Sequence, residues 1–345
     1  MDIGRPAAIR AIARARRRIS PPVPDSLSNW LNILSSIEWS QKLMYVNGAL
    51  DQFCQVPLEV LRDYGTVRFV DIAFTNVAFL QRMNVYLRAV GTVCMDGTFQ
   101  VRPRQPPDIE QLLTIQIAIP IVHALLIDRQ TESYHRVLQY FRNDLQLNLN
   151  YGQLKIITDF EQGLRNAIAR VLPQANNTGC WFHFVQCIIR YVRTYNLVQI
   201  LRANENARRI LRMLMALPHL LANEIRFHRG LFSIQSGFDV VQELYIFENL
   251  GEELHDLIQY FQRYWIDTVG PLRFTVYRLQ YRTNNFIESY HASLLRLIGQ
   301  HPSLYQFYEH LRTIEERSRN DLTSAVNGQQ VKLYSLCKHT IFNWT

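Results

Sequence analysis

The strongest constraint on the fold comes from the middle of the chain, where short apolar segments alternate with amphipathic ones. Buried strands are predicted by length and apolar content at residues 93–99, 112–119, 121–127 and 154–158, with a further short one at 179–181. Helical spacing of apolar residues is found over 131–147, 160–171 and 183–195. This order of elements predicts an α/β domain with a mixed sheet.

Helical patterns flank this domain on both sides. Residues 26–90 are predicted to be mainly helical, and residues 204–280 return to helical spacing without strand alternation. Two further helices are predicted at 284–297 and 303–318. We therefore predict five parts: a basic arm (1–24), a helical region (25–90), the α/β core (91–203), a helical insertion (204–280) and a helical C-terminal part (281–345).

The chain is basic, with a formal net charge of +8. A basic protein of this size tends to bind polyanions, most often nucleic acid. The arginines are densest near the start, where Arg14, Arg16, Arg17 and Arg18 precede a segment with three prolines. A DNA-contacting or nuclear-import arm, an organelle transit peptide and a disordered tail all fit this segment, and we favour the arm.

Cysteine usage and hydropathy bear on the compartment. The chain has five cysteines, an odd number, and their spacing shows no disulfide framework, which favours a reducing compartment. No apolar run reaches the roughly 18 residues that a membrane helix needs, and the start of the chain lacks the apolar core of a signal peptide. We therefore expect a nuclear protein without a membrane segment.

Two aspartates stand where predicted strands end. Asp96 lies near the end of the 93–99 strand, and Asp159 directly follows the 154–158 strand. Carboxylates at the ends of neighbouring strands can converge, and such oxygen ligands suit hard divalent cations such as Mg²⁺. Strand-end aspartates also serve as turn or cap residues. Their joint placement in a basic protein makes a metal site a competing interpretation.

A third acid is available on a predicted helix. Glu288 lies at the border of the apolar stripe of the 284–297 helix, which lets it face a partly buried polar site. A solvated surface glutamate is the alternative interpretation. Glu161 follows Asp159 so closely that it is a second candidate for the third ligand.

Cys180 and His183 form a C-x-x-H pair, which is half of a zinc site. No second pair with matching spacing is present, so the sequence does not favour zinc. We expect both side chains to be buried near the sheet and to have a structural role beside the acids. The sequence also lacks a glycine-rich phosphate loop, a G-x-S-x-G elbow and a dinucleotide fingerprint, which disfavours kinases, hydrolases and dehydrogenases.

Taken together, five short segments resemble the transposase domain of Mutator-like elements in their order and separation. They are Met95-Asp96-Gly97-Thr98-Phe99, Thr158-Asp159-Phe160-Glu161, Gly179-Cys180-Trp181-Phe182-His183-Phe184-Val185-Gln186, Arg282-Thr283-Asn284-Asn285-Phe286-Ile287-Glu288 and His301-Pro302-Ser303-Leu304. The resemblance covers about residues 91–318. It implies a ribonuclease-H-like core with an all-helical insertion before the last catalytic helix.

The resemblance also implies a site and an activity. The catalytic and metal-binding triad falls on Asp96, Asp159 and Glu288, and the family's C-x-x-H signature falls on Cys180 and His183. The implied cofactor is a pair of Mg²⁺ or Mn²⁺ ions. The implied reaction is metal-dependent cleavage of double-stranded DNA at the transposon ends and strand transfer to target DNA.

We expect cationic residues around the triad to neutralise phosphates. The candidates, chosen by proximity in sequence, are Lys155, Arg282 and Arg296 together with the arginines of the arm. A homodimer is a further expectation. Two alternatives remain: a transposase-derived DNA-binding protein with a host role and little or no catalysis, and a nuclease of the same fold that cleaves without joining.

Overall fold

The computed structural model describes residues 21–45, 52–60, 69–87, 91–117, 119–143, 152–223 and 232–329. Within them, seven strands form one mixed sheet in the order β1-β2-β5-β4-β3-β6-β7. The strands are β1 (Cys54–Val60), β2 (Phe69–Phe74), β3 (Thr92–Thr98), β4 (Gln111–Gln116), β5 (Pro120–Leu126), β6 (Lys155–Thr158) and β7 (Asn176–Gly179). Neighbours are antiparallel from β1 to β3, and β3, β6 and β7 are parallel. This confirms the predicted α/β fold with a mixed, ribonuclease-H-like sheet.

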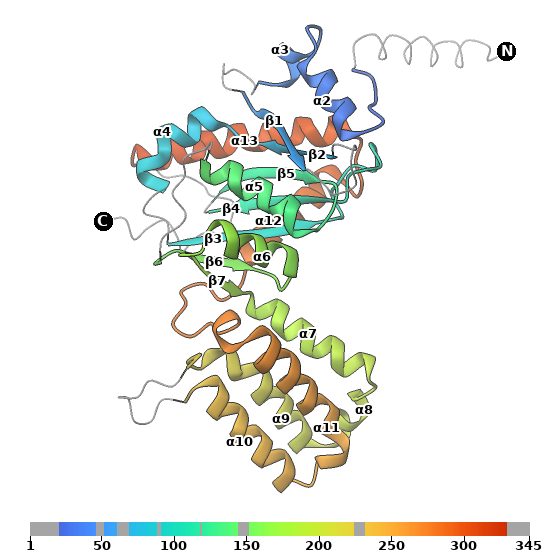
Figure 1. Cartoon of the computed structure of the whole chain (residues 1–345), viewed down its shortest axis with the longest axis vertical. Helices are drawn as coiled ribbons and strands as arrows, with labels where there is room; N and C mark the ends of the chain where they lie inside the picture. Colours follow the sequence, from blue (N-terminus) through green and yellow to red (C-terminus); the bar gives the residue numbers. More distant parts are fainter. Residues whose placement is uncertain are drawn as a thin grey trace, which may run out of the picture.

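Helices cover both faces of the sheet (Figure 1). One face is packed by α4 (Val77–Leu87), α5 (Thr131–Asn143) and α6 (Gln162–Val171). The other face is packed by α2 (Leu27–Ser35), α12 (Asn285–Ile298) and α13 (Leu304–Val326). The short helix α3 (Ser40–Leu43) adds Leu43 to this second core. The central strands β4 and β5 are buried almost throughout because both of their faces are covered.

The segment expected to be mainly helical, residues 25–90, also contains two strands. β1 and β2 lie in it, pair antiparallel with each other and extend the sheet beyond β5. A short apolar run does not by itself distinguish a strand from a helix. The choice is made here by a distant partner, since Ile72 of β2 pairs with Leu125 of β5.

The remaining helices form a separate helical unit at the β7 edge of the sheet (Figure 1). Its elements are α7 (Trp181–Thr194), α8 (Val198–Ala203), α9 (Glu205–Ala216), η1 (Leu217–His219), α10 (Ile234–Phe247), α11 (Gly251–Tyr260), η2 (Phe261–Val269) and η3 (Pro271–Arg273). These helices share one apolar core that includes Phe184, Ile210, Phe238 and Trp265. The unit therefore takes in α7 and α8, which precede the predicted 204–280 insertion.

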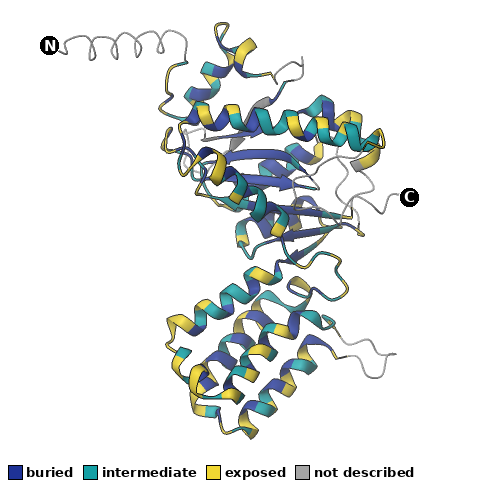
Figure 2. Cartoon of the chain, turned by 180° about the vertical axis from the view of Figure 1, so that it is seen from behind, coloured by how far each residue is buried: buried dark blue, intermediate teal, exposed yellow. Residues whose placement is uncertain are grey.

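Burial follows this division into two bodies. Figure 2 shows buried residues filling the sheet and the inner faces of the helical unit, while exposed residues lie on the outer helical faces. The two bodies are joined at the start of α7 and again just before α12. At this junction the Trp181 amide donates to the Arg282 carbonyl, with a distance of 2.9 Å.

Candidate active site

Asp96 and Asp159 occupy facing positions on neighbouring parallel strands. Cys94 of β3 pairs with Ile157 of β6, and two residues further along both strands this register brings Asp96 opposite Asp159. Neighbouring strands lie about 4.8 Å apart. Asp96 lies within β3, two residues before its end, whereas Asp159 directly follows β6. The two aspartates are thus brought together by the sheet itself.

The side chain of Asp96 points to the face that α12 covers. Side chains alternate along β3, so Asp96 shares a face with Cys94, which packs with Cys180 and Ile287. Asp96 is only 8% exposed, and its Oδ2 lies 3.5 Å from Nδ1 of His291 on α12. The apolar contact seats α12 on the sheet beside the two aspartates.

Glu288 reaches the site from the first turn of α12. Its Oε1 lies 3.3 Å from Nε2 of His183, and both side chains are about 30% exposed (30% for His183 and 29% for Glu288). Glu288 therefore does face a partly buried polar site, as its position at the border of the apolar stripe indicated.

The C-x-x-H segment holds the starts of two helices together. Cys180 is fully buried at the N-cap of α7, and the Asn284 amide, at the N-cap of α12, donates to its sulfur over 3.5 Å. Burial raises the pKa of the Cys180 thiol to about 11. The expectation that both residues are buried is right for Cys180 and wrong for His183, whose ring reaches out to Glu288. Sequence spacing alone could not show this, because the contact depends on how α12 docks.

Asp96 interacts electrostatically with both Asp159 and Glu288. Burial is the main cause that raises the pKa of Asp159 and of Glu288, and the negative charge of Asp96 raises both further. His183 acts on the same two carboxyls in the opposite direction and lowers both pKa values. The acids at 96, 159 and 288 thus share one partly buried environment with His183.

A fourth carboxylate, Glu161, lies at the edge of this group. Its amide donates to Asp159 over 3.0 Å, and its own carboxylate accepts a 2.5 Å hydrogen bond from the buried Tyr134 hydroxyl. Gln111 donates to the same hydroxyl. Burial is the largest influence that raises the pKa of Glu161, and the charges of Asp159 and Asp96 add to it. The alternate ligand considered from the sequence is therefore present at the site.

A row of buried polar side chains extends the site across the sheet. Thr114 pairs with Asp96 on one side and with His123 on the other, so the three side chains share a face. The ring of His291 lies 3.1 Å from the Thr114 hydroxyl through Nε2, and His123 Nε2 lies 2.6 Å from the Tyr290 hydroxyl. This row of polar side chains was not among the predicted site residues. Polar residues inside the buried strands at 114 and 123 were the available signal.

The predicted cationic residues are spread out. Lys155 begins β6, so it lies at the opposite end of that strand from Asp159. Arg296 is eight residues after Glu288, about 12 Å along α12, and bonds to Ser293. Arg282 is exposed beside the α7–α12 junction. The arginines at 14, 16, 17 and 18 lie outside the described residues.

The donor set decides which cations the site suits. The charges of Asp96, Asp159, Glu161 and Glu288 influence one another, and carboxylate oxygens are ligands that suit Mg²⁺ or Mn²⁺. Among the described residues, the group of three ligand atoms that lie within 4.8 Å of one another is formed by Cys180, His183 and Glu288, not by three of the carboxylates. Burial, however, raises the pKa of the Cys180 thiol, and its sulfur already accepts the Asn284 amide. These contacts fit the structural role expected for Cys180.

Comparison with protein families gives a match to a transposase domain. The family model of the MULE transposase domain matches residues 92–187, from the start of β3 to the middle of α7. The matched region contains Asp96, Asp159, Cys180 and His183, whereas Glu288 lies beyond it. A search of curated proteins gives no match. No helix in the described part of the chain has both the length and the apolar character to span a membrane.

Proposed function

We propose that this chain, which carries a MULE transposase domain over residues 92–187, cleaves and joins DNA at the acidic site between β3, β6 and α12. The observation that supports the proposal is the facing pair Asp96 and Asp159 on parallel strands, together with the electrostatic effect of Asp96 on Glu288 of α12. Their carboxylates repel one another, and a bound divalent cation would offset that repulsion.

Each residue of the site has a proposed role. Asp96, which influences the other acids, would hold the divalent ions together with Asp159 and Glu288. When bound, the two ions would activate the attacking oxygen and stabilise the leaving oxygen of a phosphodiester. His183 would fix the carboxylate of Glu288, and His291 would orient that of Asp96. The implied substrate is double-stranded DNA, at the element's ends and at the target.

A strand-transfer assay tests the proposal. A labelled duplex carrying the DNA that flanks the coding sequence is incubated with the protein, plasmid target and Mg²⁺ or Mn²⁺. A transposase gives cleaved ends and label joined to the plasmid, and a nuclease gives cleaved ends only. A DNA-binding protein with a host role gives binding without either product.

Matched variants make the assay specific to the site. Asp96→Asn should abolish both products while DNA binding is retained, because it removes one oxygen ligand and one negative charge. Glu253→Gln, which neutralises an exposed acid on α11, should behave like the parent. Products that persist with Asp96→Asn would refute the assignment of the site.

A further inference from the structure

Charge is divided unevenly within the helical unit. Residues 181–216, which form α7, α8 and α9, contain six arginines and one acid. Residues 234–269, which form α10, α11 and η2, contain seven acids and one arginine. The acids of the second half are mostly exposed, as are five of the six arginines of the first half. The first half of the unit, α7 to α9, is therefore basic and the second half, α10 to η2, is acidic.

The arginines point away from the core of the unit. On α7, Arg190 and Arg193 are exposed and lie opposite the buried stripe of Phe184, Ile188 and Val192. On α9, Arg209 and Arg212 are exposed, opposite the buried Ala207, Ile210 and Leu214. α7 and α9 are antiparallel neighbours, since the Trp181 indole donates to the Met215 carbonyl over 3.0 Å. Arg193 therefore lies toward the end of the unit where α9 begins.

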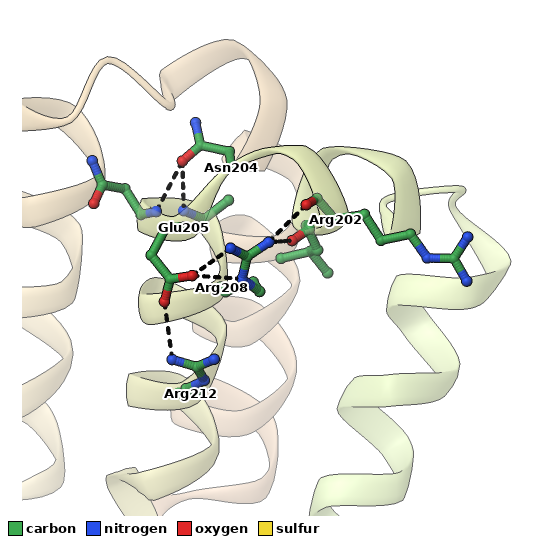
Figure 3. A network of polar contacts seen from close by, with 8 residues as sticks. Arg202, Asn204, Glu205, Arg208 and Arg212 are labelled. Carbon is green, nitrogen blue, oxygen red and sulfur yellow. Dashed lines mark hydrogen bonds and ion pairs between the residues drawn. The ribbon is translucent and has the colours of Figure 1, made fainter.

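Figure 3 shows the contacts of Glu205, the single acid of residues 181–216. Glu205 binds Arg208 and Arg212, and Arg208 also donates to the carbonyls of Leu201 and Arg202. Arg208 thereby ties α8 to α9. The other four arginines are exposed and form no ion pair within the described part of the chain: Arg190, Arg193, Arg202 and Arg209. We refer to these four as the basic face.

The basic face leads away from the acidic site. α7 begins at Trp181, carries His183 in its first turn beside Glu288, and ends at Thr194. At about 1.5 Å per residue, Arg190 lies about 10 Å and Arg193 about 15 Å from His183 along the helix. This corresponds to about three to five base pairs at roughly 3.4 Å each. Arg202 and Arg209 follow on α8 and α9.

We propose that the basic face binds the phosphate backbone of the duplex on one side of the bond being cut. The inference rests on the proposed function and adds to it a second DNA contact, outside the acidic site. Four exposed guanidinium groups without acidic partners suit phosphate oxygens, and contacts of this kind position DNA without reading its sequence. The acidic half, α10 and α11, repels the duplex and so confines it to the α7–α9 side.

Binding of duplexes of graded length tests the proposal. The duplex is extended on one side of the cleavage position at a time, from 3 to 20 base pairs, and binding is measured in EDTA so that no cutting occurs. The test variant changes all four arginines of the basic face to Gln. A matched pair of single variants, Arg193→Gln and Arg263→Gln, removes one exposed arginine from the basic and the acidic half respectively.

The expected result depends on duplex length. The fourfold variant should bind the duplex with a 3-base-pair extension as tightly as the parent does. For one of the two directions, it should bind the duplex with a 20-base-pair extension at least tenfold more weakly than the parent does. Its slope of log affinity against log salt should be shallower by about 3 to 4, since each phosphate contact contributes about 0.9. Arg193→Gln should show part of this loss and Arg263→Gln none.

Two outcomes would show that the basic face does not bind DNA while leaving the proposed function intact. The basic face is not the contact if the fourfold variant binds every length like the parent, or if Arg263→Gln weakens binding as much as Arg193→Gln. In both cases the parent still binds and cleaves DNA. If the parent binds no duplex at all, the proposed function fails and the inference fails with it.

Discussion

Nε2 of His183 lies 3.3 Å from a carboxylate oxygen of Glu288, across the junction between the helical unit and α12. Both side chains are about 30% exposed (30% and 29%), so the ion pair itself contributes little to folding stability. His183 also lowers the pKa of Asp159 and Glu288. The C-x-x-H histidine thus acts on the acids rather than on the core.

The first prediction separates His183 from Cys180. His183→Ala should change the unfolding free energy by less than about 1 kcal/mol, the range for exposed ion pairs. It should lower DNA cleavage by about 10- to 100-fold, as loss of a residue that orients a metal ligand does. The measurements are thermal unfolding and cleavage in Mg²⁺.

Cys180→Ala is the matched comparison. It should cost about 1–3 kcal/mol of stability, because the buried Asn284 amide loses its acceptor. A large loss of stability in His183→Ala would show that the histidine is structural, as the sequence had suggested. Unchanged cleavage would show that it has no part in the reaction.

The second prediction concerns Asp159 without metal. Its pKa is raised, so the folded protein holds a proton there at pH values where the unfolded chain has lost it. Stability from this group is therefore lost as pH rises from the ordinary value of 3.8 through the raised pKa. Asp159→Asn should stabilise the metal-free protein at pH 7 by about 1–3 kcal/mol, because it removes a charge that is buried and is repelled by Asp96.

Unfolding in EDTA at pH 7 and pH 4 measures this effect. The gain of Asp159→Asn should shrink toward pH 4, because the raised pKa lets the parent carboxyl take up a proton as pH falls. Added Mg²⁺ should stabilise the parent more than the variant at pH 7, because only the parent keeps the full ligand set. A variant that is less stable than the metal-free parent at pH 7 would contradict the proposed crowding of acids.

The sequence predicted the parts of the site that depend on strand order. The apolar segments that carry Asp96 and precede Asp159 were predicted as strands from their pattern, whereas the pairing of Cys94 with Ile157, 63 positions apart, comes from the tertiary structure. The position of Glu288 was predicted from the helix and the family resemblance. Its actual contact, His183, depends on packing between residues 105 positions apart, which no local pattern encodes.

The strands β1 and β2 were missed for a related physical reason. β2 is held in the sheet by β5, whose residues lie about 50 positions later in the chain, and β1 pairs only with β2. Propensity is a weak guide when tertiary pairing decides the conformation. The row formed by Thr114 and His123 was missed similarly, because polar residues within a buried strand become informative only when α12 covers them.

The third prediction concerns Glu161, held by the buried Tyr134 hydroxyl at 2.5 Å. Tyr134→Phe removes only that hydroxyl. We expect a stability loss of about 1–3 kcal/mol, because Gln111 also loses its acceptor. If Glu161 assists the acids, the Mg²⁺ concentration needed for half-maximal cleavage should rise in both Tyr134→Phe and Glu161→Gln.

Comparing the two variants decides the role of Glu161. Tyr134→Phe keeps the Glu161 carboxylate but releases it, so its Mg²⁺ requirement should rise less than that of Glu161→Gln. If the Mg²⁺ dependence of cleavage is unchanged in Glu161→Gln, the role of Glu161 is structural: it accepts the hydrogen bond of Tyr134 and precedes the first residue of α6.

The last prediction concerns acid sensitivity from His123. Burial, with a smaller contribution from His291, lowers the pKa of His123 to about 3. The folded protein therefore keeps this ring neutral, while the unfolded chain takes up a proton below the ordinary value of 6.5. Stability from this group is complete above pH 6.5 and is lost as pH falls toward 3. Between pH 7 and pH 5 the loss should be about 2 kcal/mol.

His123→Gln should remove this dependence, because glutamine does not titrate and can still accept from the Tyr290 hydroxyl. The measurement is urea unfolding of parent and variant at pH 7, 6 and 5, in which the other groups cancel in the difference. Tyr290→Phe is the control: it lowers stability by about 1–3 kcal/mol but keeps the titrating ring. Its pH dependence should match that of the parent. The parent and His123→Gln are compared by the difference between their unfolding free energies. If this difference stays constant from pH 7 to pH 5, the ring of His123 is not held neutral between α12 and the sheet.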